Sequence, residues 1–236
     1  MSLPIWQTIR DQLTAEISEG RLQSGAKLPT EAELAVRFGV NRHTVRRALG
    51  EMRDAGMVHA RRGSGVFVTS RPVAYRLGAR TRFTQPLAEQ GHAGTRRILR
   101  LETVKASALE ADLLDLPGRT PVLIMESIGV IDGHPATHGH GVFPILRLPG
   151  LEDALRETSS ITTALAAIGL PDYKRLWTRI RAERASGLIA RHLHLPEGAP
   201  VMRTRSLNVD PAGRPVELGN THFCADRIEL LVAPDD

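Results

Sequence analysis

Apolar residues recur with a helical period at the start of the chain. Ile5, Ile9, Leu13 and Ile17 are spaced four residues apart, so their side chains share one face of a helix. The spacing predicts an amphipathic helix over residues 4–19, with a proline in its first turn and a glycine directly after it.

Two more helices follow, and a capping residue marks the start of each. Thr30 stands three residues before Glu33, the spacing of a capping box, and the short helix after it ends at Gly39. Asn41 is a favourable N-cap for a third helix over residues 42–55. The face of that helix expected to be buried consists of Val45, Ala48, Leu49 and Met52.

The pattern then changes to short apolar runs. Residues 57–60 and 66–69 are separated by Arg-Arg-Gly-Ser-Gly, which predicts a two-stranded hairpin with a basic, glycine-rich tip. Ser-Arg-Pro follows, and the helical period is lost there. We therefore expect a first domain over residues 1–69, a linker over residues 70–76 where the domains reorient, and a second domain over residues 77–236.

The second domain mixes strands and helices. Strands are expected over residues 121–131, 134–143 and 174–182, and short helices over 151–158 and 160–168. The segment SALEADLLDLPGRTPVLIMESIGVIDGHP is echoed by SGLIARHLHLPEGAPVMRTRSLNVDPAGRP. Two such units are expected to pair into one sheet. The predicted class is α+β, with a helical N-terminal domain followed by a mixed α/β domain around a central antiparallel sheet.

Charge adds a candidate partner. The net charge is +5, but residues 37–62 contain seven arginines and only two acidic residues. A polyanionic partner and a solvated arginine-rich surface both fit this density. The single cysteine, Cys224, allows no intrachain disulfide. Because no segment has the pattern of a secretory leader or a membrane span, a cytoplasmic location without membrane association is expected.

The order of helices indicates a DNA contact. A short helix, a three-residue turn and a longer amphipathic helix form the pattern of a helix-turn-helix, whose second helix enters the major groove. The side chains that avoid its apolar face are Arg42, His43, Thr44, Arg46 and Arg47. The hairpin tip, as a basic wing, adds Arg61, Arg62, Gly63 and Gly65. An ordinary surface hairpin is the alternative for this tip.

The stretch LPTEAELAVRFGVNRHTVRRALGEMRDAGMVHARRGSGVFV resembles the winged helix-turn-helix of GntR-superfamily regulators. The resemblance implies DNA contacts from Arg42, Thr44 and Arg46 and from the two wing glycines. Some members carry a contacting arginine where this chain has Ala32. The resemblance therefore does not carry over an operator sequence.

Residues 76–236 resemble the UTRA effector domain of the HutC subfamily, through ARTRFTQPLAEQGH, LPGRTPVLIMESIGVIDGHP and RPVELGNTHFCADRIEL. Within it, VNRHTVRRAL and WTRIRAERA look most like phosphonate-utilisation repressors of the PhnF type. The effector residues that this implies are Arg82, Phe83, Thr84, Ser127, Arg179, Glu217, Thr221 and Phe223. A structural ion pair is the alternative for Arg82, Arg179 and Glu217. Sugar-phosphate sensors have arginines where this chain has Ser127 and Gly129, which disfavours that ligand class.

Histidines raise the question of metal. His138 and His140 alternate on one predicted strand, and His192 and His194 form a second His-x-His. No Cys/His spacing matches a known metal motif, so neither a metal nor another cofactor is expected. His138 and His140 instead become candidates for an organic-ligand pocket.

Together these features predict a ligand-responsive transcription regulator. The resemblance implies a homodimer on double-stranded operator DNA that a small anionic effector, of the phosphonate, phosphate or organic-acid type, releases. A similarity of the UTRA fold to chorismate lyase leaves an enzyme as one alternative, although no nucleophile–base pair is evident. A constitutive DNA-binding protein without an effector is the other.

Overall fold

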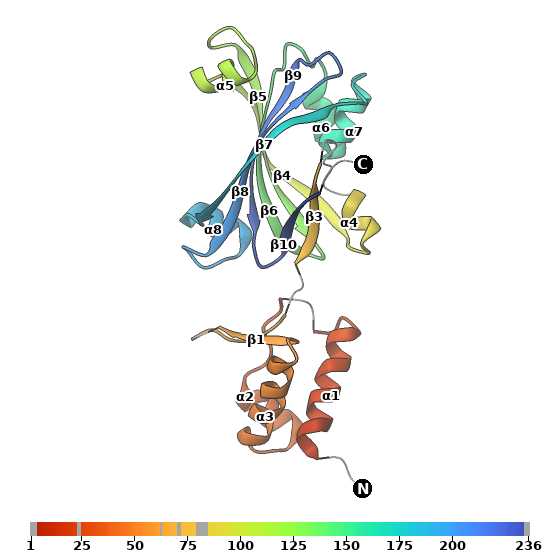
Figure 1. Cartoon of the computed structure of the whole chain (residues 1–236), viewed down its shortest axis with the longest axis vertical. Coiled ribbons are helices and arrows are strands. Elements are labelled where there is room, and N and C mark those ends of the chain that lie inside the picture. Colours follow the sequence, from red (N-terminus) through yellow and green to blue (C-terminus); the bar gives the residue numbers. More distant parts are fainter. Residues whose placement is uncertain (1–3, 23–24, 62, 70–71, 79–84, 234–236) are drawn as a thin grey trace. The chain divides into compact units, whose positions relative to one another are not determined.

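A computed structural model of the chain describes residues 4–22, 25–61, 63–69, 72–78 and 85–233 (Figure 1). It divides into two compact units, Met1–Arg71 and Pro72–Asp236. Residues 73–76, which were expected to belong to the linker, instead form part of strand β3 (Val73–Leu77) in the second unit. They are ordered as a strand because their backbone pairs with strand β10 (Ile228–Val232), which is distant in sequence. No helix within the described ranges is long and apolar enough to cross a bilayer.

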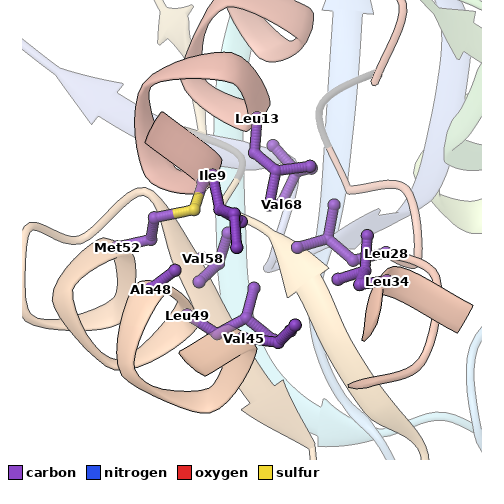
Figure 2. Packing of buried hydrophobic residues seen from close by; sticks show 10 residues of the cluster. All are labelled: Ile9, Leu13, Leu28, Leu34, Val45, Ala48, Leu49, Met52, Val58 and Val68. Carbon is purple, nitrogen blue, oxygen red and sulfur yellow. The ribbon is translucent and has the colours of Figure 1, made fainter. Parts of the chain in front are cut away.

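The described part of the first unit has three helices and a hairpin. They are α1 (Ile5–Ser18), α2 (Glu31–Phe38), α3 (Arg42–Asp54), β1 (Val58–Arg61) and β2 (Gly65–Val68), each within about one residue of its predicted bounds. Apolar side chains from all three helices and both strands meet in one core (Figure 2). The core consists of Ile9, Leu13, Leu28, Leu34, Val45, Ala48, Leu49, Met52, Val58 and Val68.

The helix ends are capped as the sequence predicts. The Thr30 hydroxyl accepts a hydrogen bond from the Glu33 backbone N–H, and the Glu33 carboxylate accepts one from the Thr30 backbone N–H. Gly39 ends α2 in the left-handed region with φ 63°, which glycine adopts at little cost. The Asn41 side chain accepts from the Thr44 N–H at 2.9 Å and so starts α3.

The second unit is built on one six-stranded sheet. Its strands lie in the order β4, β5, β6, β9, β8, β7, and all neighbouring pairs are antiparallel. Their bounds are β4 Gly94–Lys105, β5 Pro121–Ile131, β6 His134–Phe143, β7 Lys174–Arg184, β8 Pro200–Val209 and β9 Pro215–Cys224. This confirms the expected central antiparallel sheet.

The sequence echo corresponds to two similar halves of this sheet. One half consists of β4, helix α5 (Ala108–Leu113), β5 and β6, and the other of β7, helix α8 (Gly187–Leu193), β8 and β9. The halves join where β6 pairs with β9.

The two faces of the sheet are covered differently. We define the front face as the side of the sheet that bears Ser127, Ser206, Glu217 and Thr221. Two separate groups of elements pack on this face, one at each end of the strands. Helices α6 (Leu151–Thr158) and α7 (Ile161–Ala167) cover one end, and β3, β10 and α4 (Gln85–Glu89) cover the other (Figure 1). On the back face, α5 and α8 pack at opposite ends (Figure 1). The centre of each face is therefore left to polar side chains.

Candidate nucleic-acid interface and ligand cavity

Helix α3 presents a basic edge on the side opposite its core. Val45, Ala48, Leu49 and Met52 are buried, whereas the side chains predicted to meet DNA are exposed, apart from the half-buried Thr44. The exposed members are Arg42, His43, Arg46 and Arg47. The helical period thus separates the packing residues from the cationic ones.

The arginines of this edge differ in their contacts. Arg46 forms a bidentate ion pair with Glu31 of α2, at 3.0 Å from Nε to Oε1 and 2.6 Å from Nη2 to Oε2. The hydrogen bond from Arg46 lowers the pKa of Glu31 and raises that of Arg46. Arg47 lies 4.7 Å from the ring centre of Trp6, in cation–π contact. Arg42 and His43 have no hydrogen-bond or ion-pair partner among the described residues.

The hairpin tip is shaped by glycines. Gly63 and Gly65 have φ values of 74° and 112°, a region that disfavours other residues. A Cβ at Gly65 would lie 2.9 Å from Lys27 Cε, so the side chain of Lys27 crosses the tip. Lys27 also pairs with Phe67 through a β-bridge. Arg62 and the side chain of Arg61 lie outside the described part of the structure. Lys27 is a basic tip residue that the sequence pattern did not reveal.

A polar cavity of about 470 Å³ opens on the front face of the sheet, within the size range of small-molecule sites. Its walls come from β3, β4, the segment joining α6 to α7, and strands β7 to β9. The polar side chains that line it are Tyr75, Thr95, Arg96, Thr158, Ser159, Ser160, Thr162, Tyr173, Arg175, Ser206, Asn208, Glu217 and Thr221. A smaller pocket of about 60 Å³ adjoins it and shares Tyr75, Arg96, Arg175, Ser206 and Thr221.

Hydrogen bonds fix the charged groups of the cavity. Arg96 donates to the Ser127 hydroxyl at 3.2 Å. Arg175 donates to Asn208 Oδ1 at 2.6 Å, and Asn208 in turn donates to Glu217 Oε2 at 2.6 Å. Burial raises the pKa of Tyr75, so this phenol stays neutral and is able to donate a hydrogen bond. The arrangement presents two oriented guanidinium groups and many hydroxyls to a ligand.

Both units match families of known proteins. Residues 6–68 match the family described as bacterial regulatory proteins, gntR family, and residues 89–229 match the UTRA domain. The chain belongs to the GntR family of regulators. Its UTRA domain places it in the HutC subfamily, whose members regulate transcription and are not enzymes. The regulator accordingly binds DNA through its helix-turn-helix and an effector through its UTRA domain.

Individual relatives cover nearly the whole chain. The regulator is 36% identical over 233 residues to an HTH-type transcriptional regulator of Rhizobium meliloti, covering 98% of this chain and 96% of the relative. It is 32% identical to the probable transcriptional regulator PhnF of Escherichia coli, covering 96% and 94%. The crystal structure of PhnF from Mycobacterium smegmatis shares the fold at 22% identity, with a TM-score of 0.67 and coverage of 96% and 99%.

The regulator's cavity brings together some of the predicted effector residues. Glu217 and Thr221 line it, Ser127 contacts the lining residue Arg96, and Phe223 lines the adjoining pocket. Arg82, Phe83 and Thr84 lie outside the described residues. The two cavity arginines, Arg96 and Arg175, were not predicted from the sequence.

The remaining candidates do not lie at the cavity. Arg179 is paired with Arg205 on the back face, where a separate depression is lined by four arginines: Arg179, Arg181, Arg203 and Arg205. His138 and His140 also point to the back face, since the front-face residue Gly139 lies between them on β6. The structure therefore does not join these three residues with Glu217 and Thr221.

Proposed function

We propose that the regulator is a repressor that leaves its operator when a small anionic ligand enters the front-face cavity. The observation that carries this proposal is the charge of the cavity: its described lining residues include two guanidinium groups, Arg96 and Arg175, and one carboxylate, Glu217. A phosphonate, a phosphate ester or an organic acid would be bound through oriented, charge-assisted hydrogen bonds. Glu217 favours a ligand that also carries an amino or hydroxyl donor.

The proposed DNA contacts are the exposed edge of α3 and the wing. Arg42 is free to reach a base or a phosphate, whereas Glu31 holds Arg46 in a fixed orientation. Thr44, His43 and Arg47 flank these two along the same edge. At the wing, Gly63 and Gly65 let the backbone approach the duplex, and Lys27 adds positive charge beside them.

The family resemblance supports a homodimer with two-fold symmetry. In that arrangement two copies of α3 enter successive major grooves about 34–36 Å apart, on a near-palindromic operator. The ligand changes DNA affinity only through its different affinity for the DNA-competent and released states.

The test compares two arginines of strand β7. Thermal unfolding of the full chain is measured with inorganic phosphate, 2-aminoethylphosphonate and citrate, next to uncharged glycerol. We expect an anion of this panel to raise the melting temperature by about 5–10 °C at roughly 100 times its Kd. Arg175→Gln removes a cavity charge and should abolish the shift, while Arg179→Gln, on the opposite face, should keep it.

The outcomes separate the cavity from other sites. An anion-induced shift that survives in both Arg175→Gln and Arg96→Gln, or that disappears only in Arg179→Gln, contradicts binding in the front-face cavity. Circular dichroism of each variant checks that the fold is retained.

A further inference from the structure

Three side chains with metal-ligating atoms converge on the back face of the sheet. Glu126 comes from β5, His138 from β6 and His192 from α8, and their ligating atoms all lie within 4.8 Å of one another. His138 Nε2 and Glu126 Oε1 are 2.7 Å apart, and the rings of His138 and His192 stack with their centres 5.0 Å apart.

The fold holds these three side chains in place. Strands β5 and β6 are paired along their length, and α8 packs against β6. Arg227 ties the end of α8 to the start of β6, since its Nη1 donates to Pro135 O at 2.5 Å and to Leu193 O at 3.0 Å. His192 thus projects from an anchored helix toward His138, which is a buried residue of strand β6.

Hydrogen bonding alone does not account for this cluster. The contact between Glu126 and His138 explains two of its members, but His192 forms no hydrogen bond with any described residue. His222, opposite His138 on β9, has a buried Nδ1 that also lacks a hydrogen-bond partner there. The cluster therefore offers unpaired imidazole nitrogens beside a carboxylate.

We propose that Glu126, His138 and His192 bind a divalent first-row transition ion, for which Zn²⁺ is the appropriate probe. Two imidazoles and one carboxylate are a ligand set that suits zinc, with a water molecule in the fourth position. Bonds of about 2.0–2.1 Å in a tetrahedral site place ligand atoms about 3.3 Å apart. The Glu126–His138 contact would open by about half an ångström. His192, whose ligating atom lies within 4.8 Å of the other two, would close in by at most about 1.5 Å.

The ion would clamp α8 onto the sheet without entering the ligand cavity. The cluster lies on the back face, and the cavity lies on the front face. The nearby cation Arg203 is already paired with Glu183 at 3.1 Å and with Asn220, which limits its repulsion of a bound ion. Zinc binding by this cluster can therefore be tested independently of effector binding in the front-face cavity.

The experiment measures zinc on the tag-free full chain in the absence of DNA and effector. After chelator treatment and dialysis against Zn²⁺, mass spectrometry of the metal should give one zinc per chain, and competition with a chromophoric chelator gives its Kd. Glu126→Gln and His192→Asn should each weaken binding by about 10–100-fold or more. His194→Asn is the matched control, because His194 is exposed, adjoins α8 and has φ 53°, a conformation that asparagine tolerates.

Two further readouts do not depend on the affinity measurement. Zinc should raise the melting temperature of the wild type and of His194→Asn, but not of the two ligand variants. Co²⁺ should produce the visible absorption of a four-coordinate site in the same two proteins. Failure to retain stoichiometric zinc, or equal zinc affinity in the wild type and both ligand variants, would overturn the proposal.

Discussion

The arginines of α3 have the same charge but unequal freedom. Arg46 is held by the carboxylate of Glu31, and Arg47 covers the ring of Trp6. Arg42 is exposed and has no such partner among the described residues. A guanidinium without a protein partner does not have to break an ion pair or a ring contact when it binds DNA. Arg42 is therefore expected to contribute most to DNA recognition.

Replacing Arg42 tests this ranking. Arg42→Ala should cost about 1–3 kcal/mol of binding free energy if the side chain reads a base, and should relax the preference at that base pair. If Arg42 binds phosphate, the loss should be equal for all sequences and the salt slope should fall by about 1. Fluorescence anisotropy with a duplex selected from a random library measures both quantities.

Arg53→Ala is the control on the same helix. Arg53 is also exposed, but it lies 11 residues further along α3, which corresponds to about 16 Å. An equal loss of affinity in both variants would contradict the assignment of the N-terminal edge of α3.

The residue-level predictions succeeded where local pattern decides. The capping residues and the two faces of α3 follow from spacing of a few residues, so the sequence predicted them. Lys27 was missed because a β-bridge between distant residues brings it to the wing tip. Arg96 was missed because its place in the cavity depends on which strands of the sheet lie beside it.

Among the elements, α1 and α2 are joined by a part-buried ion pair. Arg37 Nη1 donates to Glu16 Oε2 at 3.1 Å, and the Glu16 side chain is only 9% exposed. This hydrogen bond lowers the pKa of Glu16 below its ordinary value of 4.5. The stability it contributes is therefore present above the unfolded-state pKa and is lost as the pH falls through the folded-state pKa.

Glu16→Gln should show this dependence. We expect it to lower the unfolding free energy of the first unit by about 1–2 kcal/mol at pH 7, and the difference from wild type should shrink between about pH 5 and pH 3. Trp6 fluorescence during urea unfolding, in a Trp177→Phe background, reports on the first unit alone. A difference that stays constant over this pH range would contradict the role of the pair.

Strands β7 and β8 place like charges side by side on the back face. Arg179 lies directly opposite Arg205, and Arg181 lies directly opposite Arg203. Like charges in such positions destabilise a sheet. Only Arg203 has hydrogen-bond partners among the described residues, namely Glu183 and Asn220.

Arg205→Gln should therefore stabilise the protein. Relief of the repulsion is worth about 0.2–1 kcal/mol, which should raise the melting temperature by about 1–3 °C at low ionic strength in a buffer of monovalent ions. The gain should diminish in concentrated salt. Arg203→Gln, which breaks hydrogen bonds, should instead lower the melting temperature; a fall in both variants would refute the repulsion.

Strand β7 also shows where sequence reasoning fails at this scale. Arg175 and Arg179 are four residues apart, so a regular strand would place both on one face. A bulge between Arg175 and Trp177 shifts the register, and the two arginines face opposite sides of the sheet. The strand and the sequence echo were predictable from the pattern of apolar and polar residues. The bulge was not, because that pattern contains no signal for it.

At the scale of the whole molecule, the proposed ligand control requires the two units to influence each other's binding. The regulator binds DNA through one unit and an effector through the other, and any coupling between them is reciprocal. A ligand that weakens DNA binding is therefore itself bound more weakly when DNA is present. This coupling is what distinguishes a ligand-controlled repressor from a constitutive DNA-binding protein.

The most direct test measures the Kd of the full chain for its selected duplex by fluorescence anisotropy. The measurement is made with and without a saturating anion from the thermal-shift panel, at one fixed ionic strength. We predict that the anion weakens DNA binding by about 5–150-fold, corresponding to about 1–3 kcal/mol, and that Arg175→Gln abolishes this effect while still binding the duplex. The same DNA affinity with the cavity saturated and empty would contradict the account.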